Sequence, residues 1–124
     1  MRLNQITVGA TDFDASIAFY AKLGFRLIVS ADRRYARFEL PDGEATFSIH
    51  VQDAVPAGGP VIYLEVDDVD DTVRHLRSNG IVFDTAPANQ SWRWREARLT
   101  DPAGNSLCIF KAGANRRYPP WRIS

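Results

Sequence analysis

The stretch with the most chemical potential is Ser-Trp-Arg-Trp-Arg-Glu-Ala-Arg at residues 91–98, where indole rings alternate with guanidinium groups. A tryptophan ring offers a flat surface for a planar ligand, and an arginine can hold a carboxylate through two parallel hydrogen bonds. We therefore treat Trp92, Trp94 and Arg95 as candidate ligand-binding residues. The alternative is that the tryptophans cover the core while the arginines face solvent.

Two other side chains can do chemistry of their own. A histidine such as His50 can act as a metal ligand or a general base, because imidazoles titrate near neutral pH. The alternative for His50 is a polar or structural role. Cys108 lies between Leu107 and Ile109 on a predicted strand, with no local basic neighbour to activate the thiol. We expect a buried structural cysteine that at most lines a ligand pocket.

The elements that must position these residues occur twice in the chain. Residues 11–25 match residues 67–81 at an offset of 56. Each segment has the apolar spacing of a short amphipathic helix. Asp12 and Asp68 are the expected N-caps, and Gly24 and Gly80 lie where a helix ends in a left-handed residue. Two matched sets of capping signals at one offset indicate a duplication.

Strand patterns around the helices repeat as well. Residues 3–10 and 61–68 precede the two helices, and residues 41–49 resemble residues 102–109. Further strands are predicted at residues 25–30, 35–40, 81–83 and 95–100. The sequence therefore predicts an α+β fold of two tandem βαβββ modules. We expect one domain over residues 1–112, with modules at about 1–52 and 60–112, because neither half is long enough to build a core alone.

Composition excludes several classes of protein. The chain has 124 residues, 45% of them hydrophobic and 24% charged, which is typical of a globular domain. Its formal net charge is zero, so we expect no nucleic-acid partner. The sequence has no apolar run long enough to span a bilayer, no signal-peptide pattern and a single cysteine, so we expect a cytoplasmic protein without membrane association.

The duplicated unit resembles the vicinal oxygen chelate superfamily, which includes glyoxalases, extradiol dioxygenases, fosfomycin resistance enzymes and bleomycin resistance proteins. The resemblance lies in residues 12–25, 68–80 and 92–110. It includes a helix ending in Phe-Tyr…Leu-Gly-Phe and a late strand preceded by an Asp-Pro-x-Gly-Asn turn. It implies paired modules that form a curved mixed-sheet cup, usually in a homodimer.

The resemblance also implies where a metal would bind. Metal-using relatives take ligands from the first and last strand of each module, which here are Gln5, Ser48, Val61 and Cys108. The internal repeat independently pairs Gln5 with Val61 and Ser48 with Cys108. Valine has no donor atom and a neutral serine is a weak ligand, so we expect no metal or other cofactor. The alternative is one divalent ion held by Gln5 and His50.

Strand alternation adds further residues that face the implied cup. These are Thr7, Tyr63 and Glu65, with Thr46 and Phe110 beside them. In the alternative with a metal ion, Glu65 or Cys108 completes the ligand set. We expect no catalytic residue. The predicted ligand-binding set is Gln5, Thr7, Ser48, His50, Tyr63, Glu65, Trp92, Trp94, Arg95 and Cys108.

Three functions are compatible with these residues. The first is a metal-independent protein that sequesters a small aromatic or amphiphilic ligand, as in the bleomycin resistance branch. The second is a divergent metal-dependent lyase or dioxygenase of the glyoxalase type. The third is an interaction module that works through the basic, aromatic tail at residues 113–124, which contains Tyr118 and Trp121. We expect the first, acting as a homodimer.

Overall fold

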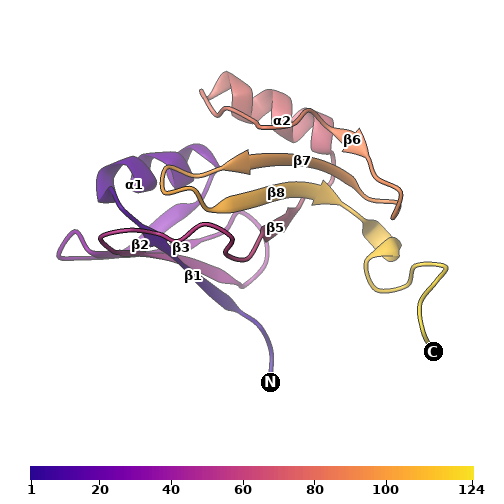
Figure 1. The fold of residues 1–124 in the computed structure, drawn as a ribbon, viewed down its shortest axis with the longest axis horizontal. Coiled ribbons are helices and arrows are strands. Elements are labelled where there is room, and N and C mark those ends of the chain that lie inside the picture. Colours follow the sequence, from indigo (N-terminus) through magenta and orange to yellow (C-terminus); the bar gives the residue numbers. More distant parts are fainter. The chain divides into compact units, whose positions relative to one another are not determined.

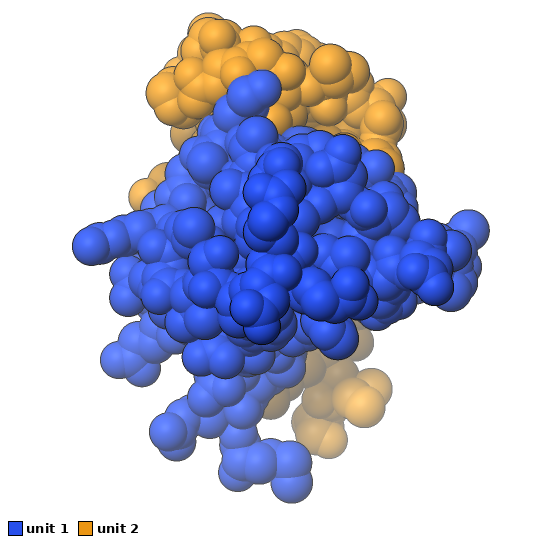
Figure 2. Space-filling view, turned by 90° about the vertical axis from the view of Figure 1, so that its left-hand side faces the viewer, with its two compact units in different colours: residues 1–60, 101–105 blue, residues 61–100, 106–124 orange.

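The α+β chain, which a computed structural model describes over residues 1–124, divides into two compact units. The first unit contains residues 1–60 together with residues 101–105, and the second contains residues 61–100 and 106–124 (Figure 2). Each unit holds a four-stranded mixed sheet and one ten-residue helix (Figure 1). The prediction of two tandem βαβββ modules is confirmed.

The first unit is built around sheet 1, whose strand order is β1-β4-β3-β2. Its outer strands are β1 (Gln5–Ala10) and β2 (Arg26–Ala31), and its inner strands are β4 (Thr46–Val51) and β3 (Tyr35–Glu39). Strand β1 runs parallel to β4, and the other neighbours are antiparallel. Helix α1 (Phe13–Lys22) connects β1 to β2.

The second unit repeats this topology in sheet 2, with the order β5-β8-β7-β6. Its strands are β5 (Ile62–Glu65), β8 (Ser106–Lys111), β7 (Arg95–Thr100) and β6 (Ala88–Asn89). Helix α2 (Val69–Ser78) follows β5, and a short 3-10 helix, η1 (Gly113–Asn115), follows β8. No helix in the structure is long and apolar enough to cross a membrane.

Both helices begin and end as the sequence predicts. The Asp12 carboxylate accepts a hydrogen bond from the Ala15 amide at 3.0 Å, and Asp68 accepts one from the Asp71 amide at 2.9 Å. Each helix ends with a glycine at positive φ, +93° at Gly24 and +91° at Gly80. The amide of the residue after each glycine, Phe25 or Ile81, donates to the carbonyl five residues earlier, which closes the helix end.

Helix α1 covers one face of sheet 1. The Tyr20 ring contacts the rings of Phe47 and Phe38, with centroids 4.6 Å and 5.9 Å away. The Tyr20 hydroxyl, which is buried, donates to Asp101 Oδ2 at 2.6 Å. Asn105 Nδ2 in the same turn donates to the Gly9 carbonyl at 2.8 Å. The turn between β7 and β8 is thereby an integral part of the first unit.

Helix α2 covers one face of sheet 2 in the same way. Its residues Val69, Val73 and Leu76 are buried, as the sequence predicts. The strands of sheet 2 contribute the other apolar side chains of this core, which are Ile62, Ala97, Leu99, Leu107 and Ile109. Because side chains alternate along a strand, the residues between these core positions project to the opposite face.

The predicted strand at residues 81–83 is wrong. The Ile81 amide is already bonded to the Leu76 carbonyl at the end of α2, and Val82 is exposed. The regular pairing with β7 is limited to Ala88 and Asn89, which follow Pro87, a residue with no amide hydrogen to donate. Residues 81–83 therefore follow the end of α2 without forming a strand, and the edge strand of sheet 2 is the two-residue β6.

Candidate functional site

The face of sheet 1 opposite α1 is polar. It carries the odd-numbered residues of β1 and β3 and the even-numbered residues of β4, because these positions pair across the sheet. We call this surface the polar face; its residues are Gln5, Thr7, Tyr35, Arg37, Glu39, Thr46, Ser48 and His50. Four predicted ligand-binding residues are thus brought together on one surface of the first unit.

A tyrosine is the centre of the hydrogen bonds on the polar face. The Tyr35 hydroxyl lies 2.8 Å from Ser48 Oγ, and Arg37 Nε donates to the same hydroxyl oxygen at 3.0 Å. The hydrogen bond with Ser48, followed by the hydrogen bond and charge of Arg37, lowers the pKa of Tyr35 below its ordinary value. Ser48 itself is fully buried beneath these groups. The predicted residue Ser48 therefore positions Tyr35.

The other predicted residues of the polar face are exposed. Thr46 Oγ1 donates to Gln5 Oε1 at 2.9 Å, and the Thr7 side chain lies between them and Gly9 along β1. The His50 ring lies edge-on to the Tyr35 ring with centroids 6.4 Å apart. His50 is therefore an accessible group beside the tyrosine, on the strand that neighbours it.

The face of sheet 2 opposite α2 is aromatic. The Trp94 and Phe110 rings stack with centroids 4.8 Å apart, and Tyr63 meets both rings edge-on at 5.8 Å and 5.5 Å. Phe110 is buried, whereas Tyr63 keeps 44% of its surface exposed. We call this surface the aromatic face. Its exposed phenol ring, backed by two fixed aromatic rings, can contact a planar ligand without first having to be ordered.

A buried carboxylate lies next to the aromatic face. Glu96, with 3% exposure, accepts hydrogen bonds from Trp92 Nε1 at 2.8 Å and from Arg98 at 3.0 Å. Arg98 also donates to the Tyr63 hydroxyl at 3.3 Å and lies over its ring at 5.8 Å. The hydrogen bond with Tyr63 is the main cause that raises the pKa of Arg98. Glu96 and Arg98 thus fix Trp92 and Tyr63 in place.

Cys108 lies beneath the aromatic face and is fully buried. Burial, with a smaller contribution from the Glu96 charge, raises the pKa of the thiol to about 12. At neutral pH the sulfur therefore stays protonated and is a poor nucleophile. The expectation that Cys108 is buried is confirmed.

Glu65 holds the start of the C-terminal segment. Its carboxylate accepts hydrogen bonds from the backbone amides of Ala112 at 2.7 Å and Gly113 at 3.0 Å, and Arg116 lies 3.8 Å away. These donors occupy the carboxylate that the sequence marks as a candidate ligand contact. Beyond them, the exposed rings of Tyr118 and Trp121 each lie near an arginine side chain.

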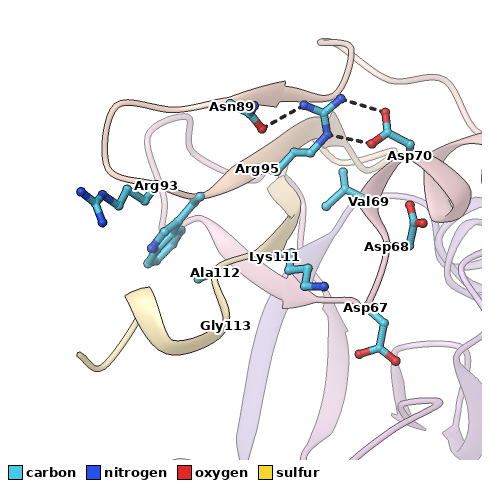
Figure 3. A pocket seen from close by; sticks show the side chains of 11 residues that line it. Asp67, Asp68, Val69, Asp70, Asn89, Arg93, Arg95, Lys111, Ala112 and Gly113 are labelled. Carbon is cyan, nitrogen blue, oxygen red and sulfur yellow. Dashed lines mark hydrogen bonds and ion pairs between the residues drawn. The ribbon is translucent and has the colours of Figure 1, made fainter. Parts of the chain in front are cut away.

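Arg95 lies on the helix side of sheet 2 and is not brought together with the aromatic face. Its Nε and NH2 groups donate to the two oxygens of Asp70 at 2.7 Å and 2.8 Å, and NH1 donates to Asn89 at 3.0 Å (Figure 3). The hydrogen bond from Arg95 lowers the pKa of Asp70. The two parallel hydrogen bonds that the sequence suggests for a ligand carboxylate are therefore made by Arg95 to Asp70 of α2.

A cavity of about 600 Å³ lies at this end of sheet 2, beside the first turn of α2. Its walls are mainly charged, and in Figure 3 the Arg93 side chain points away from Asp70 on the opposite wall. The lining residues are Asp67, Asp68, Val69, Asp70, Asn89, Arg93, Trp94, Arg95, Lys111, Ala112 and Gly113. Trp94 connects this cavity to the aromatic face.

Comparison with known families decides which proteins share this architecture. The sequence matches the profile of the Glyoxalase/Bleomycin resistance protein/Dioxygenase superfamily over residues 2–109, which is most of the chain. The chain belongs to this superfamily. The resemblance seen in its helix and turn motifs is thereby confirmed. A search of curated protein sequences finds no match.

Solved structures with this superfamily's fold include binding proteins and enzymes. A glyoxalase/bleomycin resistance protein/dioxygenase from Nocardioides is 23% identical, with a TM-score of 0.78 over 100% of this chain and 90% of its own. A bleomycin-binding protein, solved in complex with bleomycin, is 25% identical (TM-score 0.73; coverage 90% and 98%). A lactoylglutathione lyase from Agrobacterium tumefaciens is 18% identical, with a TM-score of 0.73 over 98% of this chain and 97% of its own. The fold alone therefore does not distinguish binding from catalysis.

The metal positions of the superfamily do not carry metal-binding chemistry in this chain. Val61 has no donor atom, and the Ser48 hydroxyl is buried and engaged with Tyr35. A thiol with a pKa of about 12, as at Cys108, gives up its proton to a metal only at a large cost. No group of three or more His, Cys, Asp or Glu side chains is placed to hold an ion. These donors do not fit a divalent cation.

Sequence reasoning missed four residues that shape the two surfaces: Tyr35, Arg37, Glu96 and Arg98. Strand alternation carried the signal for the last two, because Glu96 and Arg98 have the parity of Trp92 and Trp94, whereas Arg95 does not. Tyr35 and Arg37 alternate with buried Ala36 and Phe38. Their importance depends on the pairing of β3 with β4, which the sequence of a single strand does not specify.

Proposed function

We propose that this member of the superfamily is a small-molecule-binding protein that takes an aromatic or amphiphilic ligand and works without a metal. The observation that carries the proposal is the aromatic face. Tyr63 is 44% exposed there, and Trp94 and Phe110 pack edge-on against its ring. Most small-molecule sites combine apolar or aromatic walls with a few fixed polar groups; here Arg98, held by Glu96, supplies one.

The similarity to a known binding protein supports the proposal. The neighbour solved with bleomycin is 25% identical and shares nearly its whole length with this chain. That neighbour was solved in complex with bleomycin, so a protein with this fold can bind an organic molecule. Bleomycin is therefore a suitable first compound for this chain, although any planar or amphiphilic molecule of similar chemistry suits the aromatic face.

The donor chemistry described above supports the proposed metal independence. A catalytic divalent ion usually needs three or four His, Asp or Glu ligands, and the four family positions of this chain supply none of these residues. We also propose that the chain is a cytoplasmic homodimer, with residues 1–112 as one domain and residues 113–124 as a tail. Sedimentation velocity at micromolar concentration tests the dimer: a single species near 28 kDa, twice the chain's 13.9 kDa, supports it, and a 13.9 kDa species contradicts it.

The ligand proposal is tested with N-phenyl-1-naphthylamine, an uncharged aromatic probe, and with metal-free bleomycin. We expect quenching of tryptophan fluorescence by both compounds, and equal affinity for N-phenyl-1-naphthylamine in EDTA and after addition of nickel, zinc or manganese. Tyr63→Ser should weaken binding about tenfold, because it removes the exposed ring. Tyr118→Ser, which removes a ring of similar exposure from the tail, is the matched control.

Two outcomes would contradict the proposal. One is the absence of saturable binding of either compound, or equal losses in the two tyrosine variants. The other is one equivalent of metal that survives desalting and is required for binding. The second outcome would favour the metal-dependent lyase or dioxygenase, and mutation of Gln5 and His50 would then identify its ligands.

A further inference from the structure

We propose that the polar face of sheet 1 is a receptor for an oxyanion, with Arg37 binding a carboxylate or phosphate group of a small molecule. This site lies on the first unit, whereas the proposed aromatic site lies on the second. It therefore goes beyond the proposed function and does not depend on it. The argument rests on the charge, the orientation and the neighbours of Arg37.

The positive charge of Arg37 has no acidic partner. The structure contains five ion pairs within 4.0 Å, and their arginines are Arg33, Arg74, Arg95, Arg98 and Arg116. Arg37 is half-buried in the sheet surface, and its polar contact is the hydrogen bond from Nε to the Tyr35 hydroxyl. A guanidinium group has five N–H donors, so four remain for a ligand.

The orientation of the guanidinium group is fixed in advance. Tyr35 accepts the Nε hydrogen bond at 3.0 Å, and its ring lies 5.4 Å from the guanidinium carbon. Tyr35 is itself held at 2.8 Å by Ser48, which is fully buried and cannot move without disturbing β4. Ordering an arginine side chain opposes the binding of an anion, and here much of that ordering already occurs on folding.

The neighbours of Arg37 are suited to an anion of modest size. Directly across the sheet it faces Ser48, and His50 lies opposite Tyr35, exposed and able to donate a further hydrogen bond. One acidic group, Glu39, lies on the same face two residues along β3, and it pairs across the sheet with Thr46. The anion is therefore expected on the Tyr35 side of Arg37, away from Glu39.

The guanidinium fork matches carboxylates and phosphates alike. Both ligand groups are therefore compared directly, with sodium benzoate and inorganic phosphate as probes at constant ionic strength in chloride. Binding is followed by the NMR signals of the Arg37 Nε–H group and the His50 ring. We expect saturable shifts with at least one of the two anions, and the tighter one identifies the preferred group.

Arg37→Gln should weaken the binding of that anion at least tenfold, whereas Arg34→Gln, which removes an exposed charge from the adjacent turn, should leave it unchanged. Arg37→Lys keeps the charge and loses the fork, so an intermediate loss is expected. Tyr35→Phe removes the oxygen that orients Arg37 and should weaken binding several-fold. Circular dichroism checks that each variant is folded.

The proposal is overturned if neither anion gives a saturable shift, or if Arg34→Gln weakens binding as much as Arg37→Gln does. Neither result affects the aromatic site, because N-phenyl-1-naphthylamine has no charge. Retained binding of that probe in Arg37→Gln, together with lost anion binding, shows that the two sites are separate. Loss of the uncharged probe in Tyr63→Ser, with anion binding intact, gives the reciprocal result.

Discussion

At the scale of single residues, burial controls which side chains can react. Cys108 is the one cysteine of the chain, and its thiol is fully buried with a pKa raised to about 12. We predict that it reacts with Ellman's reagent at pH 8 only in the unfolded protein. The measurement compares absorbance at 412 nm with and without 6 M guanidinium chloride. Fast reaction of the folded protein would show that the aromatic face opens.

Tyr20 makes stability depend on alkaline pH. Its burial, and then the neighbouring Asp101 charge, raise the pKa of its hydroxyl above the ordinary value near 10. A group whose pKa is raised on folding stabilises the protein fully below the unfolded pKa, and this stabilisation is lost as the pH increases above it. We therefore predict that the urea concentration at the midpoint of unfolding decreases as the pH is raised from 9 to 11.

Tyr20→Phe separates this effect from other alkaline effects. The variant lacks the ionisable group, so its urea midpoint should change less over the same pH range. At pH 8 it should be less stable by about 1 kcal/mol, because Asp101 loses a buried hydrogen-bond donor. Parallel pH curves for the two proteins would contradict this role of the Tyr20 hydroxyl.

The residue scale is also where sequence reasoning was least complete. Residue types near 91–98 indicated a binding surface, but the arginine that contacts Tyr63 is Arg98, whereas Arg95 pairs with Asp70. Alternation along the strand separates these arginines, but which face is open depends on where α2 packs. The Tyr35 hydroxyl bonds to Arg37 on its own strand and to Ser48 on the neighbouring strand. The sequence of one strand does not encode its register with the next.

At the scale of elements, the two helices depend on the same pair of signals. Asp12 and Asp68 cap their N-termini, and Gly24 and Gly80 close their C-termini with positive φ angles. We predict that Asp12→Ala and Asp68→Ala each lower the free energy of unfolding by about 1 kcal/mol. Asp12→Asn and Asp68→Asn should keep most of this stabilisation, because an amide oxygen can also accept the hydrogen bond from the first turn of the helix.

Urea denaturation of the four variants measures these changes, with Asp42→Ala in an exposed turn as the control. A loss in the control as large as in the cap variants would mean that net charge, and not capping, sets the effect. The elements themselves were readable from the sequence because these signals are local. The strand predicted at residues 81–83 is absent, because Ile81 belongs to the helix ending and Val82 is exposed.

At the scale of the whole molecule, the two sequence repeats and the two compact units do not coincide. Residues 101–105 belong to the second repeat by sequence and to the first unit by structure. Without them the Tyr20 hydroxyl and the Gly9 carbonyl lose the partners Asp101 and Asn105. We predict that a fragment of residues 1–60 does not fold on its own.

Amide proton dispersion in an NMR spectrum of that fragment tests this prediction. Adding a second fragment, residues 61–124, should restore dispersion, because it supplies residues 101–105. A fragment 1–60 that unfolds cooperatively by itself would contradict the prediction. The duplication is visible in the sequence. The assignment of residues 101–105 to the first unit is not, because an Asp-Pro-Ala-Gly-Asn turn has the same sequence whichever core it packs against.

The zero net charge of the chain conceals a strong separation of charges. Residues 112–124 contain Arg116, Arg117 and Arg122 but no acidic residue, whereas Asp67, Asp68, Asp70 and Asp71 lie within five positions at the start of α2. Adsorption to a charged matrix responds to such local patches rather than to the total. At neutral pH and low salt, the protein should therefore be retained by both cation-exchange and anion-exchange resins, a behaviour useful in its purification.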